Sequence, residues 1–368
     1  MRLIGIVTGT RAEYGLLSRT IKLLQNHENF DTRIFACGAH LSPEHGNTIS
    51  ELEDCGIKNI VPVEMLISSA TRVGIAKSVG IATMSFADAF SRENLDAIMV
   101  LGDRYEILAA AQAAMFLDIP LIHIHGGEVT EGAFDDAIRH SITKMANIHF
   151  PAAKEFSERI FQLGEDPKSV FVVGSPGIDN IVNTPRMNQN ELEASLGFKL
   201  NNPIALVTYH PVTKTQVLNE NNITPLVDAI KNNPKLTYII TFPNADGGGR
   251  EIIEKWQSIE HLDNVYLVPS LGFVRYLSLM EHVDCVIGNS SSGIIEAPSF
   301  RVGTVNIGTR QNGRPKAASV IDVIMEEESI SNAIEECCQL NFKEKLLKLV
   351  NPYGQGGTAQ MIVKLLSQ

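Results

Sequence analysis

The sequence predicts an α/β protein made of two doubly wound, Rossmann-type domains with a ligand cleft between them. Its length of 368 residues exceeds what one typical core accommodates and suits two domains of about 150 to 200 residues each. Short apolar runs alternate with longer stretches of helical period, which is the pattern of strands joined by crossover helices. The alternation stalls near residue 180 and then resumes, so it divides into two series.

The first series predicts a parallel sheet with helices on both faces. Leu17, Ile21 and Leu24 form an apolar stripe at helical spacing after the first run. Parallel strands that are buried on both faces are near-continuous apolar runs. The expected strands, each followed by a polar or glycine-containing turn, are LIGIVT, TRIFAC, LDAIMVLG, PLIHIHG, NIHFPA and SVFVVG.

The second series predicts a second sheet of the same kind. After the polar stretch VNTPRMNQNELEASLGFKLNNP, its expected strands are IALVTYH, LTYIITFPN, NVYLVPS, VDCVIGN and RVGTVNIG. We therefore expect an N-terminal domain over residues 1–178 and a C-terminal domain over residues 179–354. In residues 355–368, Ile362, Leu365 and Leu366 predict a helix that crosses back onto the first domain. Ligands of such sheets bind beyond the carboxyl ends of the strands, so both domains would present loops to one crevice.

Charge and composition exclude several classes of partner. A formal net charge of −11 without a Lys/Arg block would repel nucleic acid and acidic membrane surfaces. No apolar run approaches the ~18 residues that cross a bilayer, and the N-terminus lacks the cleavage site of a signal peptide. We therefore expect a cytoplasmic protein. Five cysteines without a CxxC pair predict reduced thiols, with neither a disulfide framework nor a thiolate zinc site.

The opening run IVTGTRAEYGLL predicts an anion-binding loop. Gly9 and Gly15 lack the spacing of a dinucleotide-binding loop, so NAD binding is disfavoured. A small-residue turn followed by Arg11 at the start of a helix favours an anion, through both the guanidinium and the helix N-terminus. The alternative is a surface arginine that caps a turn.

The run IGNSSSGIIEAP is a stronger candidate for binding phosphate. Backbone amides and the hydroxyls of Ser290 and Ser291 could hold the two phosphates of a nucleoside diphosphate. Glu296 follows one to two turns later, where its carboxylate could accept hydrogen bonds from ribose hydroxyls. Arg310 and Arg314, after another predicted strand, favour the same interpretation. The alternative is a serine cap without a ligand.

Ionisable residues crowd at successive strand ends of the first domain, in VLGDRYE and HIHGGEVTEGAFDDAIRH. Desolvation and mutual charge shift the protonation of such groups, which makes them candidates for acid/base catalysis. They are Asp103, Arg104, His123, His125, Glu128, Glu131, Asp135, Asp136, Arg139 and His140. As alternatives, Asp103 could cap a helix, and Asp136 with His140 could form an i,i+4 pair.

Histidines at strand ends leave two further interpretations open. His123, His125 and Glu128 have the chemistry of a metal site, but strand alternation puts both histidines on one face, which core packing explains equally well. We therefore predict no metal. His210 ends the first strand of the second domain, where it is either a structural residue or one that faces the cleft.

Eight motifs, in register from about residue 3 to residue 317, resemble the hydrolysing UDP-N-acetylglucosamine 2-epimerases of bacterial sialic acid pathways and of the bifunctional animal enzyme. They are GTRAEYG, GDRYE, HIHGGE, DDAIRHSITKM, TYHPVT, FPNADGG, GNSSSG and GTRQNGR. The resemblance implies a GT-B-like pair of Rossmann-type domains, no nicotinamide or other cofactor, and no metal. The implied reaction converts UDP-GlcNAc and water into ManNAc and UDP.

The resemblance also implies which residues act. The UDP-binding residues would be Arg11, Arg104, Asn244, Ser290, Ser291, Glu296 and Arg310, and the catalytic residues would be Asp103, His125, Glu128, Asp135 and His210. Where the animal enzyme has HIEGGE this chain has HIHGGE, so His125 replaces a glutamate, while Glu128 occurs in both. The loop before DD is one residue longer here, so Asp135 and Asp136 are not distinguished.

These residue types suit the implied chemistry. A base at C2 and stabilisation of the departing diphosphate would give 2-acetamidoglucal by elimination. Water would then add at C1 while a proton returns to the other face of C2, which calls for a second acid/base set among His125, Glu128 and Asp135. Asp103 would help to orient the substrate or to protonate it.

Several alternatives share the fold. The closest is the hydrolysing epimerase of UDP-2,4-diacetamido-2,4,6-trideoxyglucose in the legionaminic acid route. Others are a GT-B glycosyltransferase, a non-catalytic UDP-sugar sensor, and the non-hydrolysing 2-epimerases, which have HVEAG in place of HIHGGE. The expected partner is a UDP-sugar, with neither nucleic acid nor membrane, and the resemblance implies a homodimer or homotetramer.

Overall fold

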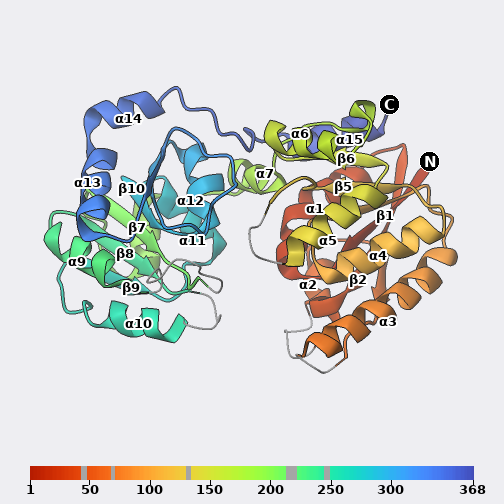
Figure 1. The fold of residues 1–368 in the computed structure, drawn as a ribbon, viewed down its shortest axis with the longest axis horizontal. Coiled ribbons are helices and arrows are strands. Elements are labelled where there is room, and N and C mark those ends of the chain that lie inside the picture. The colour runs from red at the N-terminus through yellow and green to blue at the C-terminus, as the bar shows by residue number, and fades with distance from the viewer. Residues whose placement is uncertain (43–47, 68–70, 130–133, 213–221, 244–248) are drawn as a thin grey trace. The chain divides into compact units, whose positions relative to one another are not determined.

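A computed structural model describes residues 1–42, 48–67, 71–129, 134–212, 222–243 and 249–368 of the chain. They form two compact units, Met1–Asn180 together with Gly356–Gln368, and Ile181–Gln355 (Figure 1). The first unit thus runs to Asn180, where the sequence predicted residue 178, and the C-terminal helix belongs to it.

The first unit contains a six-stranded sheet in the order β3-β2-β1-β4-β5-β6, and all neighbouring strands are parallel. The order reverses between β1 and β4, which is the topological switch point of a Rossmann-type sheet. The strands are β1 (Arg2–Thr8), β2 (Phe30–Cys37), β3 (Ile60–Val63), β4 (Ala97–Leu101), β5 (Leu121–Ile124) and β6 (Ile148–Phe150).

Helices cover both faces of this sheet. On one face Ile6 packs with Leu17 of α1 and Ile362 of α15. On the other face Val7 packs with Phe86 of α3, as the alternation of side chains along a strand requires. The helices are α1 (Arg11–Gln25), α2 (Ile49–Asp54), α3 (Arg72–Ser91), α4 (Tyr105–Phe116), α5 (Phe134–Met145), α6 (Lys154–Gln162), α15 (Thr358–Leu366) and α7 (Pro176–Asn183), which leads into the second unit.

Helix α3 is, among the described residues, long and apolar enough to cross a membrane by length and composition. Its Ala82, Phe86 and Phe90 are fully buried and belong to the same core cluster as Val7 and Val100 of the sheet. A core helix of a globular domain passes the same test, so length and composition alone do not assign α3 to a membrane.

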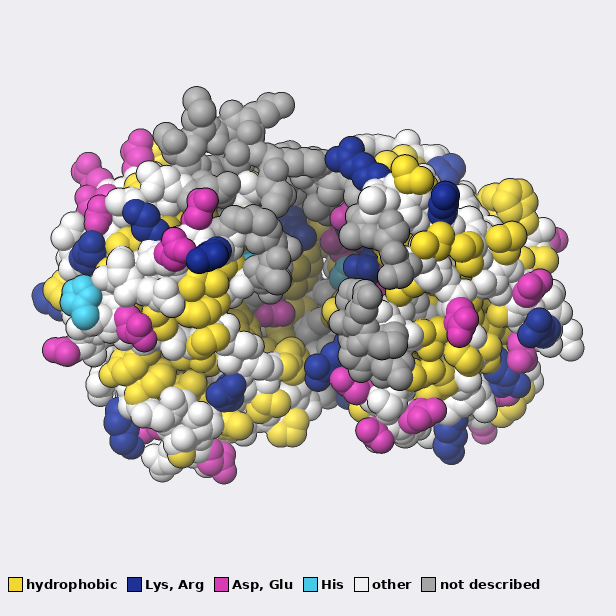
Figure 2. Space-filling model, turned by 90° about the horizontal axis from the view of Figure 1, so that it is seen from below, with side chains coloured by type: hydrophobic (Ala, Val, Ile, Leu, Met, Phe, Trp, Pro, Cys, Tyr) yellow, Lys and Arg dark blue, Asp and Glu magenta, His cyan; other side chains and the backbone are white. Residues whose placement is uncertain are grey.

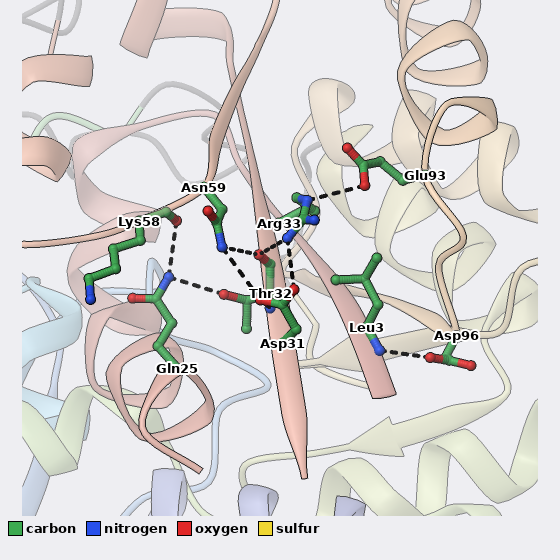
Figure 3. A network of polar contacts seen from close by, with 9 residues as sticks. All are labelled: Leu3, Gln25, Asp31, Thr32, Arg33, Lys58, Asn59, Glu93 and Asp96. Atoms are coloured by element: carbon green, nitrogen blue, oxygen red, sulfur yellow. Dashed lines mark hydrogen bonds and ion pairs between the residues drawn. The ribbon is translucent and has the colours of Figure 1, made fainter. Parts of the chain in front are cut away.

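Polar contacts join the elements at the end of the first sheet where its strands begin (Figure 3). Arg33 of β2 contacts Asp31 on its own strand and Glu93 after α3, each at 3.1 Å. Asp96 accepts a hydrogen bond of 2.7 Å from the amide of Leu3 in β1. These contacts lie where the strands begin, at the end of the sheet opposite to the carboxyl ends where ligands bind in such folds.

The second unit repeats this topology. Its parallel sheet has the order β12-β11-β10-β7-β8-β9, so the order reverses between β7 and β10, as it does between β1 and β4. The strands are β7 (Ile204–Thr208), β8 (Thr237–Thr241), β9 (Val265–Val268), β10 (Cys285–Gly288), β11 (Gly303–Ile307) and β12 (Val320–Val323). Two doubly wound parallel sheets confirm the predicted fold class.

Two apolar layers cover the second sheet. Val207 packs with Ile334 of α13 on one face, and Leu206 packs with Leu279 of α11 on the other.

The chain's five cysteines are all free thiols, and the helices of the second unit are as follows. They are α8 (Gln189–Leu196), α9 (Thr224–Asn232), α10 (Gly249–Gln257), α11 (Gly272–Met280), α12 (Ser291–Ile295), α13 (Glu327–Cys338) and α14 (Leu340–Leu346).

The expected strand SVFVVG does not form. Only Val170 makes an isolated bridge, to His149 of β6. The amides of Phe171 and Val173 still donate to the carbonyls of His149 and Pro151, at 2.9 and 3.2 Å. Pro151 has no N–H to donate in return, so the ladder is not completed beyond β6.

Three elements were absent from the predicted pattern. Helix α8 forms within the polar stretch, because Asn188 and Glu191 make a reciprocal capping box and Gly197 ends the helix in the left-handed conformation. Strands β3 and β12 are short and lie at sheet edges, and β3 contains Pro62, which an edge strand tolerates.

Charges of both signs are mixed on the surface. On the face drawn in Figure 2, Lys and Arg side chains are interspersed with Asp and Glu side chains on both units. A nucleic-acid-binding face instead concentrates basic side chains in a patch or stripe. The face in Figure 2 does not have that footprint.

The C-terminal helix α15 packs on α1, and Asp179 of α7 caps its first amides. Gly357, its N-cap residue, has no side chain to cap it. Asp179 is 1% exposed, and its two oxygens accept hydrogen bonds from the amides of Thr358 and Ala359 at 3.0 and 2.7 Å. One carboxylate therefore joins the two chain segments of the first unit.

Replacing this cap should destabilise the first unit. We expect Asp179→Ala to lower the free energy of unfolding by about 2 kcal/mol, because two buried amides lose a charged acceptor. Hydrogen exchange of the α15 amides should rise at the same time. The control is Asp166→Ala, which removes an exposed cap from Lys168 and should cost about 0.5 kcal/mol or less. Equal losses in the two variants would contradict the assignment.

Candidate active site

Several of the predicted functional residues lie at the switch points of the two sheets. In the first unit, residues 9–11 follow β1 and residues 102–104 follow β4, the pair between which the strand order reverses. In the second unit, residues 209–210 follow β7 and residues 289–291 follow β10, again the reversing pair. Loops at this point of a doubly wound sheet are where ligands bind.

Asp103 belongs to a group of interacting carboxylates. Gly102, with φ +80°, turns the chain after β4, and Asp103 accepts a hydrogen bond from Nη2 of Arg139 on α5. Burial raises the pKa of the Asp103 carboxyl above its ordinary value, and the charge of Arg139 partly opposes the shift. The negative charges of Asp135 and Glu128 add to the rise. A carboxyl with a raised pKa suits proton exchange nearer to neutral pH.

His125 and Glu128 form a histidine–carboxylate pair of the kind that acts as a general base. The Nδ1 atom of His125 lies 2.7 Å from Oε1 of Glu128, and its Nε2 atom lies 3.5 Å from Oγ of Ser175. Only 16% of the His125 side chain and 12% of the Glu128 side chain are exposed. A carboxylate at Nδ1 holds the proton on that nitrogen and leaves a lone pair on Nε2, which is the arrangement of a general base.

The backbone around His125 has a special geometry. His125 has φ +64°, the left-handed region that few non-glycine residues adopt. A Cβ at Gly126 would lie 3.0 Å from Nδ1 of His123, and one at Gly127 would lie 2.3 Å from the carbonyl oxygen of Phe156. The two glycines of HIHGGE therefore allow this loop to pack tightly on its support.

His123 is a buried support and not a partner of His125. Its Nε2 donates to the carbonyl of Gly102 at 2.8 Å, and its Nδ1 lies 3.2 Å from Oγ1 of Thr143 on α5. Burial lowers the pKa of His123 to about 3, so the ring is neutral. Strand β5 ends at Ile124, so the alternation expected to put both histidines on one face does not extend to His125.

The two aspartates at the start of α5 have different neighbours. Asp135 influences Asp103 electrostatically, and it is four residues before Arg139, on the same side of the helix. Asp136 has Oδ2 3.6 Å from Nε2 of His140, which is the i,i+4 pair considered as an alternative. The geometry therefore favours Asp135 as the member of the acid/base group.

The two arginines of the first unit differ in exposure. Arg11 has a side chain that is 75% exposed, with Nε 2.9 Å from Oε2 of Glu51 on α2. Arg104, the N-cap residue of α4, donates through Nε and Nη2 to both oxygens of Glu106, at 3.2 and 2.8 Å. Both flank the switch point, and both carry charge that suits an anionic ligand.

Asn289 organises the switch point of the second unit. Its Oδ1 accepts from the amide of His210 at 2.7 Å, and its Nδ2 donates to the carbonyl of His210 at 2.8 Å. The carbonyl of Asn289 accepts from Nη1 of Arg310 at 3.0 Å and from Nε2 of Gln311 at 2.8 Å. The fully buried side chain of Asn289 thus holds His210, while its backbone carbonyl holds Arg310 and Gln311.

The serine loop ends in a very short helix. Ser290 is the N-cap of α12, and its side chain accepts from the amide of Ser292 at 3.4 Å. Because α12 has only five residues, its dipole is weak, and the hydroxyls of Ser290 and Ser291 are the stronger candidates for phosphate contacts. Burial raises the pKa of Glu296 at the end of α12, while Ser292 partly opposes the shift.

Two organising residues, Asn289 and Arg139, were not assigned a role from the sequence. Asn289 was not singled out, although it directly precedes the serines, because a side-chain contact between two strands leaves no periodic signal. Arg139 stood in the ionisable cluster, and its spacing of four from Asp135 was the available sign. Asn244 lies outside the described residues. Within the described ranges, no group of three or more His, Cys, Asp or Glu side chains could hold a metal ion.

Comparisons with known proteins identify the family. A family model described as UDP-N-acetylglucosamine 2-epimerase matches residues 22–367. Polysialic acid biosynthesis protein P7 of Escherichia coli is 40% identical over 364 residues, covering 96% of this chain and 90% of that protein. GDP/UDP-N,N'-diacetylbacillosamine 2-epimerase (hydrolyzing) of Campylobacter jejuni is 38% identical over 346 residues, covering 93% of this chain and 89% of that protein.

A solved structure has the same fold. UDP-GlcNAc 2-epimerase from Neisseria meningitidis, bound to UDP-GlcNAc, matches with a TM-score of 0.81 and 20% identity, over 100% of both chains. At that identity the likeness concerns the fold alone, and it confirms the GT-B-like class. The sequence matches extend further, and they show that the chain belongs to the UDP-N-acetylglucosamine 2-epimerase family, among the hydrolysing UDP-sugar 2-epimerases.

Proposed function

We propose that the chain converts UDP-GlcNAc and water into ManNAc and UDP, and so supplies sialic acid biosynthesis. The observation that carries the proposal is the group of Asp103, His125, Glu128 and Asp135, which brings acid and base side chains together in one unit. The 40% identity to a polysialic acid biosynthesis protein supports this pathway. The chemistry requires proton transfers and a stabilised leaving group, so it calls for no nicotinamide and no metal.

The first step is an elimination. His125, with Glu128 on its Nδ1, removes the proton from C2 of the sugar through Nε2. The electron pair of the C2–H bond forms the C1–C2 double bond, and the bond from C1 to the diphosphate oxygen breaks. The products of this step are 2-acetamidoglucal and UDP.

The second step is a hydration with the opposite stereochemistry at C2. Asp103, whose pKa is raised by burial, delivers a proton to the other face of C2. Asp135 accepts a proton from the water that adds at C1. The sugar leaves as ManNAc. The cycle closes when the proton that Asp135 took from water passes to Asp103, the proton that His125 took from C2 is released, and His210 recovers a proton from solvent.

The second unit supplies the groups that hold UDP. Ser290, Ser291 and Arg310 contact the phosphates, and Glu296 accepts hydrogen bonds from the ribose. His210, fixed by Asn289, lies beside the leaving diphosphate and offers it a proton. Arg11, Arg104 and Asn244 complete the proposed set of UDP contacts.

A second substrate has an observation in its favour. The Campylobacter jejuni relative, 38% identical over nearly the whole chain, is named for diacetylbacillosamine. UDP-2,4-diacetamido-2,4,6-trideoxyglucose would use the same catalytic groups, and it differs from UDP-GlcNAc at C4 and C6 of the sugar. The proposal also includes a cytoplasmic enzyme that works as a homodimer or homotetramer.

Product analysis tests the proposed reaction. We expect incubation with UDP-GlcNAc to yield free ManNAc and UDP by NMR, with faster turnover than UDP-2,4-diacetamido-2,4,6-trideoxyglucose. The reverse preference would assign the second substrate. Formation of UDP-ManNAc would exclude the hydrolysing reaction, and transfer of the sugar to an acceptor would indicate a glycosyltransferase.

Isotope exchange tests the role of His125. In heavy water the ManNAc should carry deuterium at C2, because its C2 proton comes from solvent. His125→Ala should lower kcat/KM by about a thousandfold while UDP still binds, since a general base contributes on that scale. The matched control is His140→Ala, a histidine that faces Asp136 on α5 and should leave turnover within about twofold. Unlabelled ManNAc would rule out the mechanism.

A substitution at Asn289 tests the second unit. Asn289→Ala removes two hydrogen bonds to His210 and should weaken UDP binding at least about tenfold, with a stability loss of about 2 kcal/mol. Asn233→Ala also removes two side-chain hydrogen bonds in this unit, at the end of α9, and should leave UDP affinity unchanged. Calorimetric titration with UDP and thermal unfolding measure the two effects. Unchanged UDP affinity in Asn289→Ala would remove Asn289 from the site.

A further inference from the structure

A second pair of carboxylates lies buried beside the Arg11 loop. Glu13 in the first turn of α1 is 7% exposed, and Glu106 in the first turn of α4 is 1% exposed. Arg104 joins them, because its Nε and Nη2 donate to both oxygens of Glu106 and its Nε lies 3.7 Å from Oε1 of Glu13. The mechanism above gives neither glutamate a role.

Glu13 also holds the backbone of the loop. Oε2 of Glu13 accepts from the amide of Gly9 at 2.6 Å, and the carbonyl of Gly9 accepts from the amide of Ala39 at 2.9 Å. Gly38 packs against the same group, since a Cβ there would lie 3.2 Å from Oε1 of Glu106. The backbone just before Thr10 and Arg11 is therefore held by the Glu13 carboxylate.

Glu106 also orients Arg104. It occupies the guanidinium edge formed by Nε and Nη2, while Nη1 makes no hydrogen bond with any described residue. The Arg104 side chain is 44% exposed. The bidentate pair thus fixes the plane of the guanidinium and leaves one nitrogen for an anionic ligand.

The cluster has one more negative group than positive. With both carboxyls ionised, Glu13 and Glu106 outnumber the single charge of Arg104. Burial raises the pKa of Glu13 to about 7; the Gly9 amide and Arg104 oppose the shift, and the charge of Glu106 adds to it. Oε1 of Glu13 is buried without a hydrogen-bond partner among the described residues, which favours a proton on the carboxyl over a full negative charge.

The other groups around Glu13 keep their charge state near neutral pH. Burial and the two carboxylates raise the pKa of Cys37 at the end of β2, so it stays a thiol. Burial lowers the pKa of His40 to about 4, so its ring is neutral. Burial raises the pKa of Tyr105, which stays a phenol, and the carboxylates raise that of Arg104, which stays charged.

We propose that Glu13 and Glu106 are positioning residues for the leaving diphosphate, and that Glu13 takes up a proton when the diphosphate binds. The inference rests on the proposed function, in which Arg11 and Arg104 contact UDP. A diphosphate near these groups adds negative charge and makes an ionised Glu13 less favourable. By linkage, affinity then depends on pH. Below pH 7 Glu13 already holds its proton, and above pH 7 binding must add one, so UDP affinity falls.

Titration calorimetry with UDP tests the proton uptake. At pH 8 the UDP phosphates are ionised, since the terminal phosphate titrates near pH 6. Measured in two buffers of different ionisation enthalpy, the wild-type chain should take up more protons per UDP bound than Glu13→Gln, by a difference of up to about one proton. Its UDP affinity should fall by up to about fivefold from pH 7 to pH 8. Glu13→Gln keeps a neutral side chain of the same shape, and it should show a smaller proton uptake and a smaller fall of affinity than the wild type.

Two further variants complete the experiment. Glu106→Gln should raise KM about tenfold with a smaller change in kcat, because Arg104 loses its bidentate partner. Glu93→Gln is the matched control. Glu93 also pairs with an arginine, Arg33, but near the end of the sheet where the strands begin (Figure 3). It should leave KM and proton uptake unchanged.

The outcomes separate the two proposals. Equal proton uptake by the wild type and Glu13→Gln would overturn the role of Glu13 while leaving the UDP site intact. Failure of the wild-type chain to bind UDP would overturn the proposed function, and this inference with it. The wild-type measurement needs no variant, so a folding defect in a variant cannot decide the result.

Discussion

The reversal of strand order at the centre of each sheet is the constraint on which the rest of the structure depends. At β1 and β4, the chain leaves two neighbouring parallel strands in opposite directions, and α1 and α4 pack on opposite faces. The loops between them separate, which leaves backbone amides and helix starts open to a ligand. The same separation at β7 and β10 exposes His210 and Ser290. In each unit the candidate functional residues therefore lie at the carboxyl ends of the strands, and structural contacts lie at their amino ends.

Neutral polar groups hold these open points together. Gly288, with φ +136°, passes so close to β7 that a Cβ would lie 2.0 Å from the carbonyl oxygen of Thr208. Just beyond it, Asn289 pairs with the backbone of His210 much as another strand residue would. In the first unit, His123 joins Gly102 to Thr143 in a similar way. Buried amide and imidazole groups with satisfied hydrogen bonds fix geometry without adding charge beside the ionisable side chains.

The sequence predicted what depends on local pattern. Central strands are apolar runs, so both sheets and the strand ends that carry Asp103 and His210 could be located. Short edge strands such as β12 leave too few residues for a pattern, and Pro151 interrupts a ladder that composition alone favours. The choice between Asp135 and Asp136 required the phase of α5. The pairing of Glu13 with Arg104 joins two helices far apart in sequence, and no spacing rule reaches across such a separation.

The cap on α15 has a consequence for how the chain matures. Ribosomes deliver the N-terminus first, yet Asp179 receives its partners only when Thr358 and Ala359 have been synthesised. During translation the first unit therefore stays incomplete, and the face of α1 that α15 covers stays exposed, while the second unit is synthesised and can fold. The domain begun first is the domain finished last. Its closure requires that Thr358 and Ala359 have been synthesised.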